Sequence, residues 1–354
     1  MYFPHITSIR FFAALLVFIH HVEQFKRSFE LPYFDHKWIE NAGYFGVQIF
    51  FVLSGFLISS ILFRELKMKG KVSLRKFYLK RVYRIWPLFY LIFFVSIVFY
   101  FIFFNLQIPD GILWPLNSKS IILSILLLPN FGYVFFQGIP FFLHSWSIGV
   151  EEQFYVFWPL LFLKKNNFLL VISLILVIFS SYDFINSFGK ELMPILYDNV
   201  HFDRWHSFNI EPMLWGAWVF FLYERFSETF VKLIANKLTL SIFLLFNGIT
   251  FFGGFWFPLF HFQIMSLSIG LLIASFAFQK NRFSILENTV MNYLGNISYG
   301  IYMIHPFVLF VYFYLSESPG SICTYVVCLS ITLLLSSLSY EYFEKSFLRL
   351  KNRL

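Results

Sequence analysis

Apolar segments recur along the whole chain and are separated by shorter polar stretches. Ten of them are long enough to cross about 30 Å of hydrocarbon as helices that rise about 1.5 Å per residue. These segments cover residues 6–24, 43–63, 86–105, 145–163, 168–182, 208–223, 238–253, 262–279, 297–315 and 322–342. The pattern predicts an all-α fold, a polytopic membrane helix bundle of about ten transmembrane helices.

One further apolar stretch, residues 119–143, is broken in its second half. The breaking residues are Pro129, Asn130, Gly132, Gln137, Gly138 and Pro140. Proline and glycine in such numbers interrupt a helix. The stretch can be a full span or a re-entrant segment, and the basic residues around it favour the second.

The basic residues decide the predicted orientation. The net charge is +8, and its carriers stand in short runs between apolar stretches, which is typical of cytoplasmic loops rather than of a nucleic-acid surface. The loop 64–84 is the most basic and is therefore predicted to be cytoplasmic. With 119–143 re-entrant, both termini and the other basic loops are also cytoplasmic, while 183–207, 254–261 and 316–321 lie outside.

Composition excludes a water-soluble protein, because 58% of the residues are apolar and only 13% are charged. No internal repeat or soluble linker interrupts the pattern, so we expect a single integral-membrane domain over 1–354, with no appended soluble domain. Residues 6–24 follow no basic leader and are predicted to be a retained span. Cys323 and Cys328 lie in an apolar segment, which predicts neither a disulfide nor a metal site.

Ionisable residues inside the first span are the clearest chemical signal, because a charge in hydrocarbon is costly. Arg10 and His21 are eleven residues apart, about three helical turns, so they share one helix face. His20 points some 80° away from Arg10, toward a neighbouring helix or lipid. The alternative is a snorkelling arginine with interfacial histidines.

A second polar cluster lies in the segment SWSIGVEEQFYVFWP, residues 145–159. Ser147, Glu151 and Tyr155 recur at every fourth position and share a face, from which Glu152 is turned by about 100°. Carboxylates there must pair, accept hydrogen bonds or stay protonated. We interpret Glu151 as functional and leave open whether Glu152 is functional or pairs with a structural Arg or His.

Arg81 and Arg84 lie three residues apart where a helix begins at the predicted inner membrane surface. Two guanidinium groups on one side of a helix match phosphate, either of a nucleotide or of lipid headgroups. They can equally be topology signals. Later in the chain, Gly55, Gly295 and Gly300 are interpreted as helix-packing residues, whereas His305 is either a ligand contact or a histidine hydrogen-bonded inside the bundle.

Together these segments resemble the acyltransferase 3 family, bacterial membrane proteins that acetylate lipopolysaccharide, exopolysaccharide and related glycans. The matches follow the family's order along nearly the whole chain: R-x10-H at Arg10 and His21, GV-x-x-FFVLSGF at 46–56, R-x-x-R at Arg81 and Arg84, WS-x-x-x-E-x-QFY at 146–155, and SYGIYMIHP at 298–306. There are two departures. Gln48 stands where an acidic residue is common, and Ser346 replaces a customary proline after Glu344.

The resemblance implies an enzyme, an O-acetyltransferase of the stand-alone form in the bacterial inner membrane. Its donor would be acetyl-CoA or another acyl-CoA, held by Arg10, Arg81 and Arg84, and its acceptor a glycan or lipid-linked sugar. His21 would be the general base or acyl relay and Glu151 its orienting carboxylate. Substrate-binding or site-shaping roles would fall to Ser54, Trp146, Ser147, Gln153, Tyr155, Tyr299 and His305. The expected set of cofactors and partners includes no metal and no nucleic acid.

Two other functions fit the same residues. In a proton-coupled transporter or flippase, Arg10, His21 and Glu151 would form a proton relay through the bundle. The chain can also be a non-catalytic subunit for polysaccharide export. A transporter moves its substrate without coenzyme A, whereas an acyltransferase leaves ester groups on the glycan.

Overall fold

The computed structural model describes residues 3, 5–104, 112–164, 167–192, 208, 210–234, 236–254, 257, 260–278, 286–316 and 321–353, with the backbone alone at 182–192, 321 and 352. The regular structure in these residues is almost entirely helical, which confirms the all-α prediction. The chain groups into two compact units that alternate along the sequence. The first unit comprises Met1–Arg10, Val47–Val72 and Gln153–Asn292, and the second comprises Phe11–Gly46, Ser73–Glu152 and Tyr293–Leu354.

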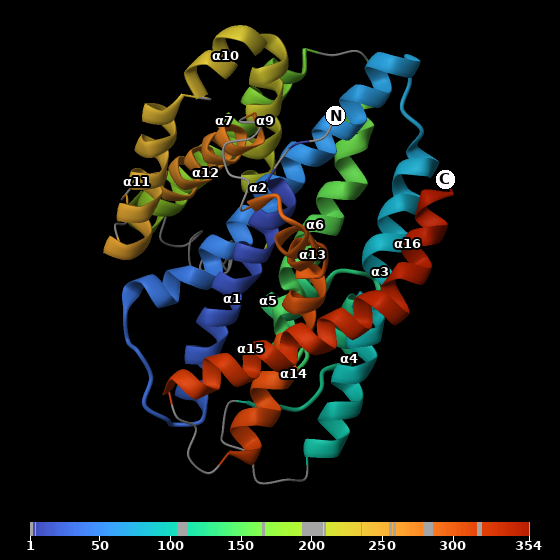
Figure 1. The fold of residues 1–354 in the computed structure, drawn as a ribbon, viewed down its shortest axis with the longest axis vertical. Helices are drawn as coiled ribbons and strands as arrows, with labels where there is room; N and C mark the ends of the chain where they lie inside the picture. The colour runs from blue at the N-terminus through green and yellow to red at the C-terminus, as the bar shows by residue number, and fades with distance from the viewer. Residues whose placement is uncertain are drawn as a thin grey trace. The chain divides into compact units, whose positions relative to one another are not determined.

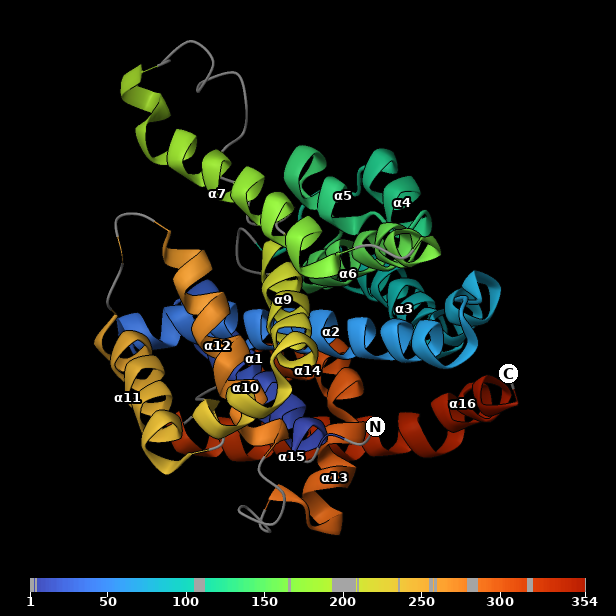
Figure 2. The same ribbon diagram turned by 90° about the horizontal axis from the view of Figure 1, so that it is seen from above.

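The first unit is built around α9 (Glu211–Arg225), which packs against α7 (Phe168–Leu192), α10 (Ser227–Ile234) and α12 (His261–Ala277). Figure 2 shows α11 (Lys237–Gly253) beside α12. The latter part of α2 (Lys37–Lys69) and the 3-10 helix η2 (Trp158–Leu163) also belong to this unit.

Two glycines let α2 and α9 approach backbone to backbone. A methyl group on Gly55 would overlap the carbonyl of Met213, and one on Gly216 would overlap the carbonyl of Val52. The helix-packing role expected for Gly55 is therefore what the structure shows. Small residues at such crossings stabilise helix pairs in membranes through close van der Waals packing.

We expect Gly55→Ala to lower the thermal midpoint of the detergent-solubilised protein, because the two helices must separate to admit the methyl group. Overpacking of this kind costs about 1–3 kcal/mol. Gly248→Ala in α11 is the matched control, since a methyl group there meets no atom within 4 Å. The measurement is the amount of protein that still elutes as a folded species in size-exclusion chromatography after heating to a series of temperatures. Equal midpoints for the two variants would contradict the close crossing.

The second unit holds most of the remaining helices. They are α1 (Ile6–Ser28), α3 (Leu74–Phe103), α4 (Ser118–Ile125), α5 (Pro129–Phe136), η1 (Leu143–Ser145), α6 (Trp146–Phe157), α13 (Thr289–Asn296), α14 (Ser298–Leu315), α15 (Ser321–Leu338), the π-helical turn η5 (Ser339–Glu344) and α16 (Lys345–Asn352). Helices α1, α6 and α13 also contribute residues to the first unit. α14 packs on α15 and α3, and α16 runs beside α3 (Figure 1).

Within the part of the chain that the structure describes, five helices are long and apolar enough to cross a membrane: α1, α2, α3, α14 and the continuous run Ile322–Lys351. A sixth candidate arises if the bent pair α10 and α11 is one span. A polytopic helical membrane protein is therefore supported, but not the number ten. The predicted span 145–163 is α6 followed by the 3-10 turn of η2, and α12 and the apolar part of α7 fall short of the required length.

The stretch 119–143 is not one continuous helix. It contains α4 and α5, each 8 residues long, and a left-handed residue, Leu127, lies between them. A helix of that length spans about 12 Å, well short of the hydrocarbon core. α4 and α5 pack on each other, as the two arms of a re-entrant segment would.

The basic stretch 64–84 is mostly helical rather than a loop. α2 continues to Lys69 and α3 begins at Leu74. A hydropathy pattern identifies only the apolar part of a helix. The backbone hydrogen bonds of α2 and α3 continue beyond that part, into the basic residues of 64–84. The predicted outer loops 183–207 and 316–321 lie largely outside the described residues.

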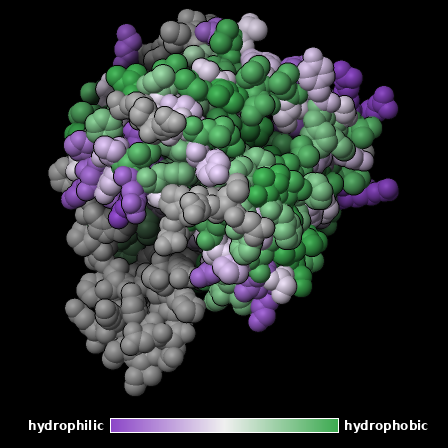
Figure 3. All heavy atoms as spheres, turned by 90° about the horizontal axis from the view of Figure 1, so that it is seen from below, coloured by the Kyte–Doolittle hydropathy of each residue, from purple (hydrophilic) through white to green (hydrophobic). Residues whose placement is uncertain are grey.

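Large apolar side chains cover much of the surface. Examples are Phe94, Phe101, Val177, Ile178 and Leu334, each at least 60% exposed. Figure 3 shows hydrophobic residues across much of one face, with hydrophilic side chains gathered at its margins. Monomeric soluble proteins rarely expose patches of this extent, so this surface fits contact with lipid.

Candidate functional site

Three histidines meet inside the second unit, each from a different element: His21 from α1, His144 from η1 and His305 from α14. His21 Nδ1 lies 2.6 Å from His305 Nε2. Their ring centroids are 4.9 Å apart and their planes differ by 15°, which places the two imidazoles edge to edge. The ring of His144 is 5.8 Å from that of His305.

The sequence of α14 explains how His305 is held. Pro306 has no backbone N–H, so the carbonyl four residues earlier, that of Tyr302, lacks its usual helical partner. The His305 ring turns back onto this part of the helix, and its Nδ1 lies 2.9 Å from the carbonyl oxygen of Ile301. A carbonyl can only accept a hydrogen bond, so Nδ1 of His305 carries the proton.

This arrangement also fixes the tautomer of His21. A neutral His305 protonated at Nδ1 has a lone pair on Nε2, which accepts a hydrogen bond from Nδ1 of His21. The remaining nitrogen of His21, Nε2, then carries a lone pair. His305 is fully buried, whereas His21 keeps part of its surface open. The hydrogen-bonded pair of His21 and His305 therefore presents one oriented basic nitrogen, Nε2 of His21.

His144 is held by two hydroxyl groups. Tyr302 donates its hydroxyl to the His144 carbonyl at 2.6 Å, and the Ser147 hydroxyl lies 2.7 Å from that of Tyr302. Ser147 was predicted from the sequence as a site residue, whereas His144 and Tyr302 were not. His144 could have been found as the histidine two residues before the Trp146-Ser147 pair, and Tyr302 as the tyrosine three residues before His305.

A cavity of about 140 Å³ opens at the histidine cluster. It is lined by His21, Gln24, Phe25, Ser28, Ile112, Trp114, Phe141, Leu143, His144 and Pro306. His21, Gln24 and Ser28 follow one face of α1 at helical spacing, so this helix contributes polar groups to one wall. A small concave site with a few polar groups is typical of ligand pockets.

A buried ion pair fixes the part of α1 that follows His21. Lys26 Nζ lies 2.6 Å from Glu23 Oε1, and both side chains are 3% exposed. Glu23 also accepts hydrogen bonds from the Phe34 backbone N–H and from the Tyr325 hydroxyl of α15. These contacts hold α1 in register against α15.

His20 points away from the cluster, as its helical phase predicts. Its Nδ1 lies 3.0 Å from the Ile39 carbonyl oxygen, and its ring packs where Gly43 of α2 leaves room. This pairing gives His20 a packing role between α1 and α2. It does not line the cavity.

The two arginines of α3 belong to a second polar cluster. Trp86 donates to Glu152 at 3.2 Å, and Tyr299 donates to the Ile85 carbonyl at 3.0 Å. Arg81 interacts electrostatically with Glu152, and Arg84 with Glu344 of η5. The side chains of Glu152 and Glu344 are both 8% exposed, so these two interactions between a carboxylate and a guanidinium group lie inside the protein. Glu152 therefore has an arginine, Arg81, as its neighbour.

The other predicted site residues occupy several places. Tyr155 donates to Ser54 at 3.3 Å within the first unit. Glu151, on α6, interacts electrostatically with Tyr299 and Tyr302 in the second unit. Arg10 lies on α1 three turns before His21, and Trp146 and Gln153 lie on α6, all three partly exposed. Nδ1 of His21 contacts His305, and the orienting role of Glu151 stays a prediction.

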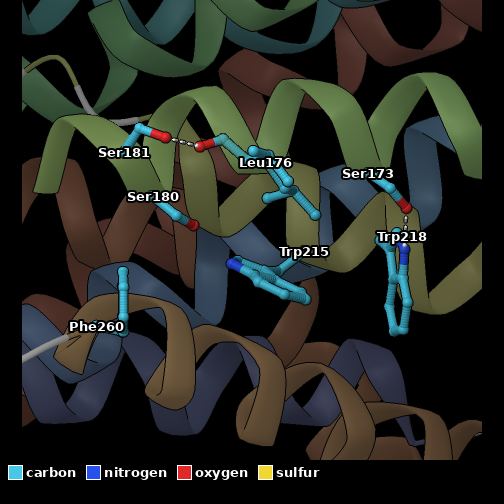
Figure 4. A pocket seen from close by; sticks show the side chains of 8 residues that line it. Ser173, Leu176, Ser180, Ser181, Trp215, Trp218 and Phe260 are labelled. Atoms are coloured by element: carbon cyan, nitrogen blue, oxygen red, sulfur yellow. Dashed lines mark hydrogen bonds between the residues drawn. The ribbon is translucent and has the colours of Figure 1, made fainter. Parts of the chain in front are cut away.

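A wider groove of about 620 Å³ lies in the first unit. Figure 4 shows Ser173, Ser180 and Ser181 of α7 above Trp215 and Trp218 of α9, with Phe260 at one side. Ser173 accepts from Trp218 at 3.0 Å, and Ser181 bonds its own helix at the Val177 carbonyl. The hydroxyl groups of Ser173 and Ser181 are therefore occupied, and the lining of the groove is mainly apolar.

The fold and the histidine cluster define a helical membrane protein with an oriented imidazole base beside a cavity. The chain belongs to the acyltransferase 3 family, because the family model described as an acyltransferase domain matches residues 4–341. The chain is 24% identical to a provisionally named O-acetyltransferase of Staphylococcus aureus strain COL over 98% of its own length. It is also 24% identical to O-acetyltransferase OatA of strain NCTC 8325, over 97%.

These similarities cover only part of the relatives. The chain spans about 57% of the length of each of these two proteins. No solved structure shows significant similarity to the chain.

Proposed function

We propose that this protein transfers an acetyl group from acetyl-CoA to a hydroxyl group of a cell-surface glycan. The observation that carries the proposal is the oriented lone pair on His21 Nε2, which the hydrogen bond to His305 produces at the wall of the cavity. A neutral imidazole can accept a proton at physiological pH, which a hydroxyl acceptor requires. Family membership and the names of the relatives support the same chemistry.

In the proposed reaction, His21 Nε2 removes the proton of the acceptor hydroxyl. The oxygen of that hydroxyl attacks the thioester carbonyl carbon at the same time. The carbon–sulfur bond breaks, the coenzyme A thiolate leaves, and the proton held by His21 passes to that thiolate. The products are the O-acetyl ester and free coenzyme A. The hydrogen bond from Nδ1 to His305 keeps the ring oriented through both proton transfers, as the third member of a hydrolase triad does.

Arg81 and Arg84 are proposed to hold the phosphates of the donor, with Arg10 assisting. Buried carboxylates near both arginines, Glu152 and Glu344, limit where the guanidinium groups can turn. Planar guanidinium groups bind phosphate oxygens in pairs, which lysine cannot do.

We expect Arg84→Lys to raise the KM for acetyl-CoA several-fold, although the charge is kept, because the forked geometry is lost. Arg84→Ala should raise it further. Arg75→Ala is the control, since Arg75 lies on the first turn of the same helix and is exposed. Unchanged KM values in Arg81→Ala and Arg84→Ala would reduce this pair to topology signals.

We further propose a location in the bacterial inner membrane, with ten spans, both termini cytoplasmic and 119–143 re-entrant. The positive-inside rule supports this orientation, since α2 and α3 carry the basic stretch 64–84 on adjoining ends. The acceptor would then be reached from the opposite side, as a glycan or a lipid-linked sugar.

Single cysteines test this orientation after Cys323 and Cys328, both free thiols, are replaced. Cysteines at Ser73 and Ser227, which are exposed, should resist an impermeant thiol reagent in intact cells. A cysteine at Asn186, near the end of α7, should react, because the stretch 183–207 is predicted to be outside. All three should react in permeabilised cells. Labelling at position 73 in intact cells would invert the orientation.

The function itself is tested by incubating membranes with acetyl-CoA labelled in the acetyl group. Label should enter alkali-labile esters of the glycan fraction only when the protein is present. Transport of a sugar without incorporation of label would instead favour the transporter. Ester formation that does not need His21 would overturn the proposed mechanism.

A further inference from the structure

His144 is the one imidazole of the cluster for which the proposed reaction has no use. It is 6% exposed, and its Nε2 makes no hydrogen bond with any residue that the structure describes. The other side of the ring interacts with the backbone of Met303 in α14. Buried polar atoms are hydrogen-bonded in the great majority of native sites, so an unpaired nitrogen in the wall of a ligand cavity points to a ligand group.

The structure also fixes what kind of group this nitrogen can meet. Nδ1 of His144 donates its proton to the backbone carbonyl of Met303. In a neutral imidazole the other nitrogen, Nε2, is then a hydrogen-bond acceptor. Protonation of His144 is disfavoured mainly because its ring is buried, and further because His21 lies beside it. The partner of His144 must therefore be a hydrogen-bond donor.

His144 and His21 line the same small cavity, with Phe141 and Trp114 among its other walls. The indole N–H of Trp114 donates to the Gly138 carbonyl at 3.3 Å, so this ring contributes an apolar surface rather than a free donor. Sugar rings match such a site, because their C–H faces pack on aromatic rings while their hydroxyl groups meet polar atoms at the edge.

We propose that His144 binds the acceptor: it accepts a hydrogen bond from a second donor group, hydroxyl or amide N–H, on the same sugar unit whose hydroxyl is deprotonated by His21. The acceptor is then a sugar with at least two hydrogen-bond donors, and His144 is a residue that determines its specificity. This inference rests on the proposed function. Tyr302 and Ser147 act as positioning residues, because they hold the backbone that carries His144.

The test uses methyl glucoside and its four monodeoxy derivatives as acceptors, with labelled acetyl-CoA and membranes that contain the protein. One of the derivatives should keep the hydroxyl that is esterified but lack the hydroxyl that bonds His144. For the wild type, kcat/KM for this derivative should be lower than for methyl glucoside by a factor of about 10² or more, because Nε2 of His144 is left without a donor. In His144→Phe, kcat/KM should fall for methyl glucoside and stay unchanged for that derivative, so that the discrimination disappears.

Two further variants separate binding from folding. His144→Asn keeps an acceptor oxygen and should restore part of the discrimination. His20→Phe changes an imidazole outside the cavity and should leave the discrimination intact. A purely structural role for His144 would lower kcat/KM for every acceptor by the same factor, and that result would overturn the inference.

The outcomes also distinguish the two proposals. If esters form in a His21-dependent manner and His144→Phe keeps the full discrimination, only the role of His144 is wrong. If the cell's own glycan is esterified but no methyl glucoside is, one sugar unit does not supply both contacts and the inference fails. If no ester forms on any acceptor, the proposed function fails and this inference fails with it.

Discussion

Replacement of His21 by alanine should lower the rate of ester formation by about 10²- to 10⁴-fold, the usual contribution of a general base. His305 cannot supply a replacement for the lone pair on His21 Nε2, because its own Nε2 accepts the hydrogen bond from His21 and its Nδ1 donates to the Ile301 carbonyl. The KM for acetyl-CoA should change little, because the donor phosphates are assigned to other residues. The measurement is label incorporation per amount of inserted protein.

His20→Ala is the matched control for this prediction. The two histidines are adjacent in sequence and similar in chemistry, but His20 bonds the Ile39 carbonyl and packs on α2. Its loss should reduce thermal stability and leave the rate per folded molecule within a few-fold of the wild type. An inactive His20→Ala together with an active His21→Ala would show that the assignment by helical face is wrong.

The sequence alone predicted the class of fold, because hydrocarbon imposes a simple rule of apolar length on each helix. It could not predict where helices continue or break. α2 runs on to Lys69 because backbone hydrogen bonding does not depend on hydropathy, and the span expected at 145–163 changes to a 3-10 turn after Phe157. Pro159, at the start of this turn, lacks the N–H that a continuing α-helix would use.

Part of the candidate site was also readable from sequence. Helical periodicity predicted that Arg10 and His21 share one face of α1 and that His20 points away from it. In the structure His21 contacts His305, whereas His20 contacts the Ile39 carbonyl on another side of the helix. The contact between His21 and His305 was not readable, because 284 residues separate them and only tertiary packing brings them together. Glu151 was assigned the orienting role because a carboxylate is the familiar partner of a catalytic imidazole.

Replacing His305 tests the hydrogen bond that orients His21. We expect His305→Leu, similar in size and apolar, to lower kcat by about 10²-fold or more with little change in the KM for the donor. The reason is that Nδ1 of His21 loses its acceptor, and the wrong tautomer then places a proton on the nitrogen that must act as base. His305→Gln should recover part of the activity, because its side-chain oxygen can reach the position of Nε2 and accept the same hydrogen bond.

Non-additivity separates this role from a structural one. The double variant His21→Ala with His305→Leu should be no slower than His21→Ala alone, as expected for residues that act as a unit. A structural role for His305 would instead lower activity further and would not be relieved by glutamine. If His305→Leu stays active while Glu151→Gln is as slow as His21→Ala, the carboxylate rather than the second imidazole supports the base, since only the partner of Nδ1 sets the tautomer of His21.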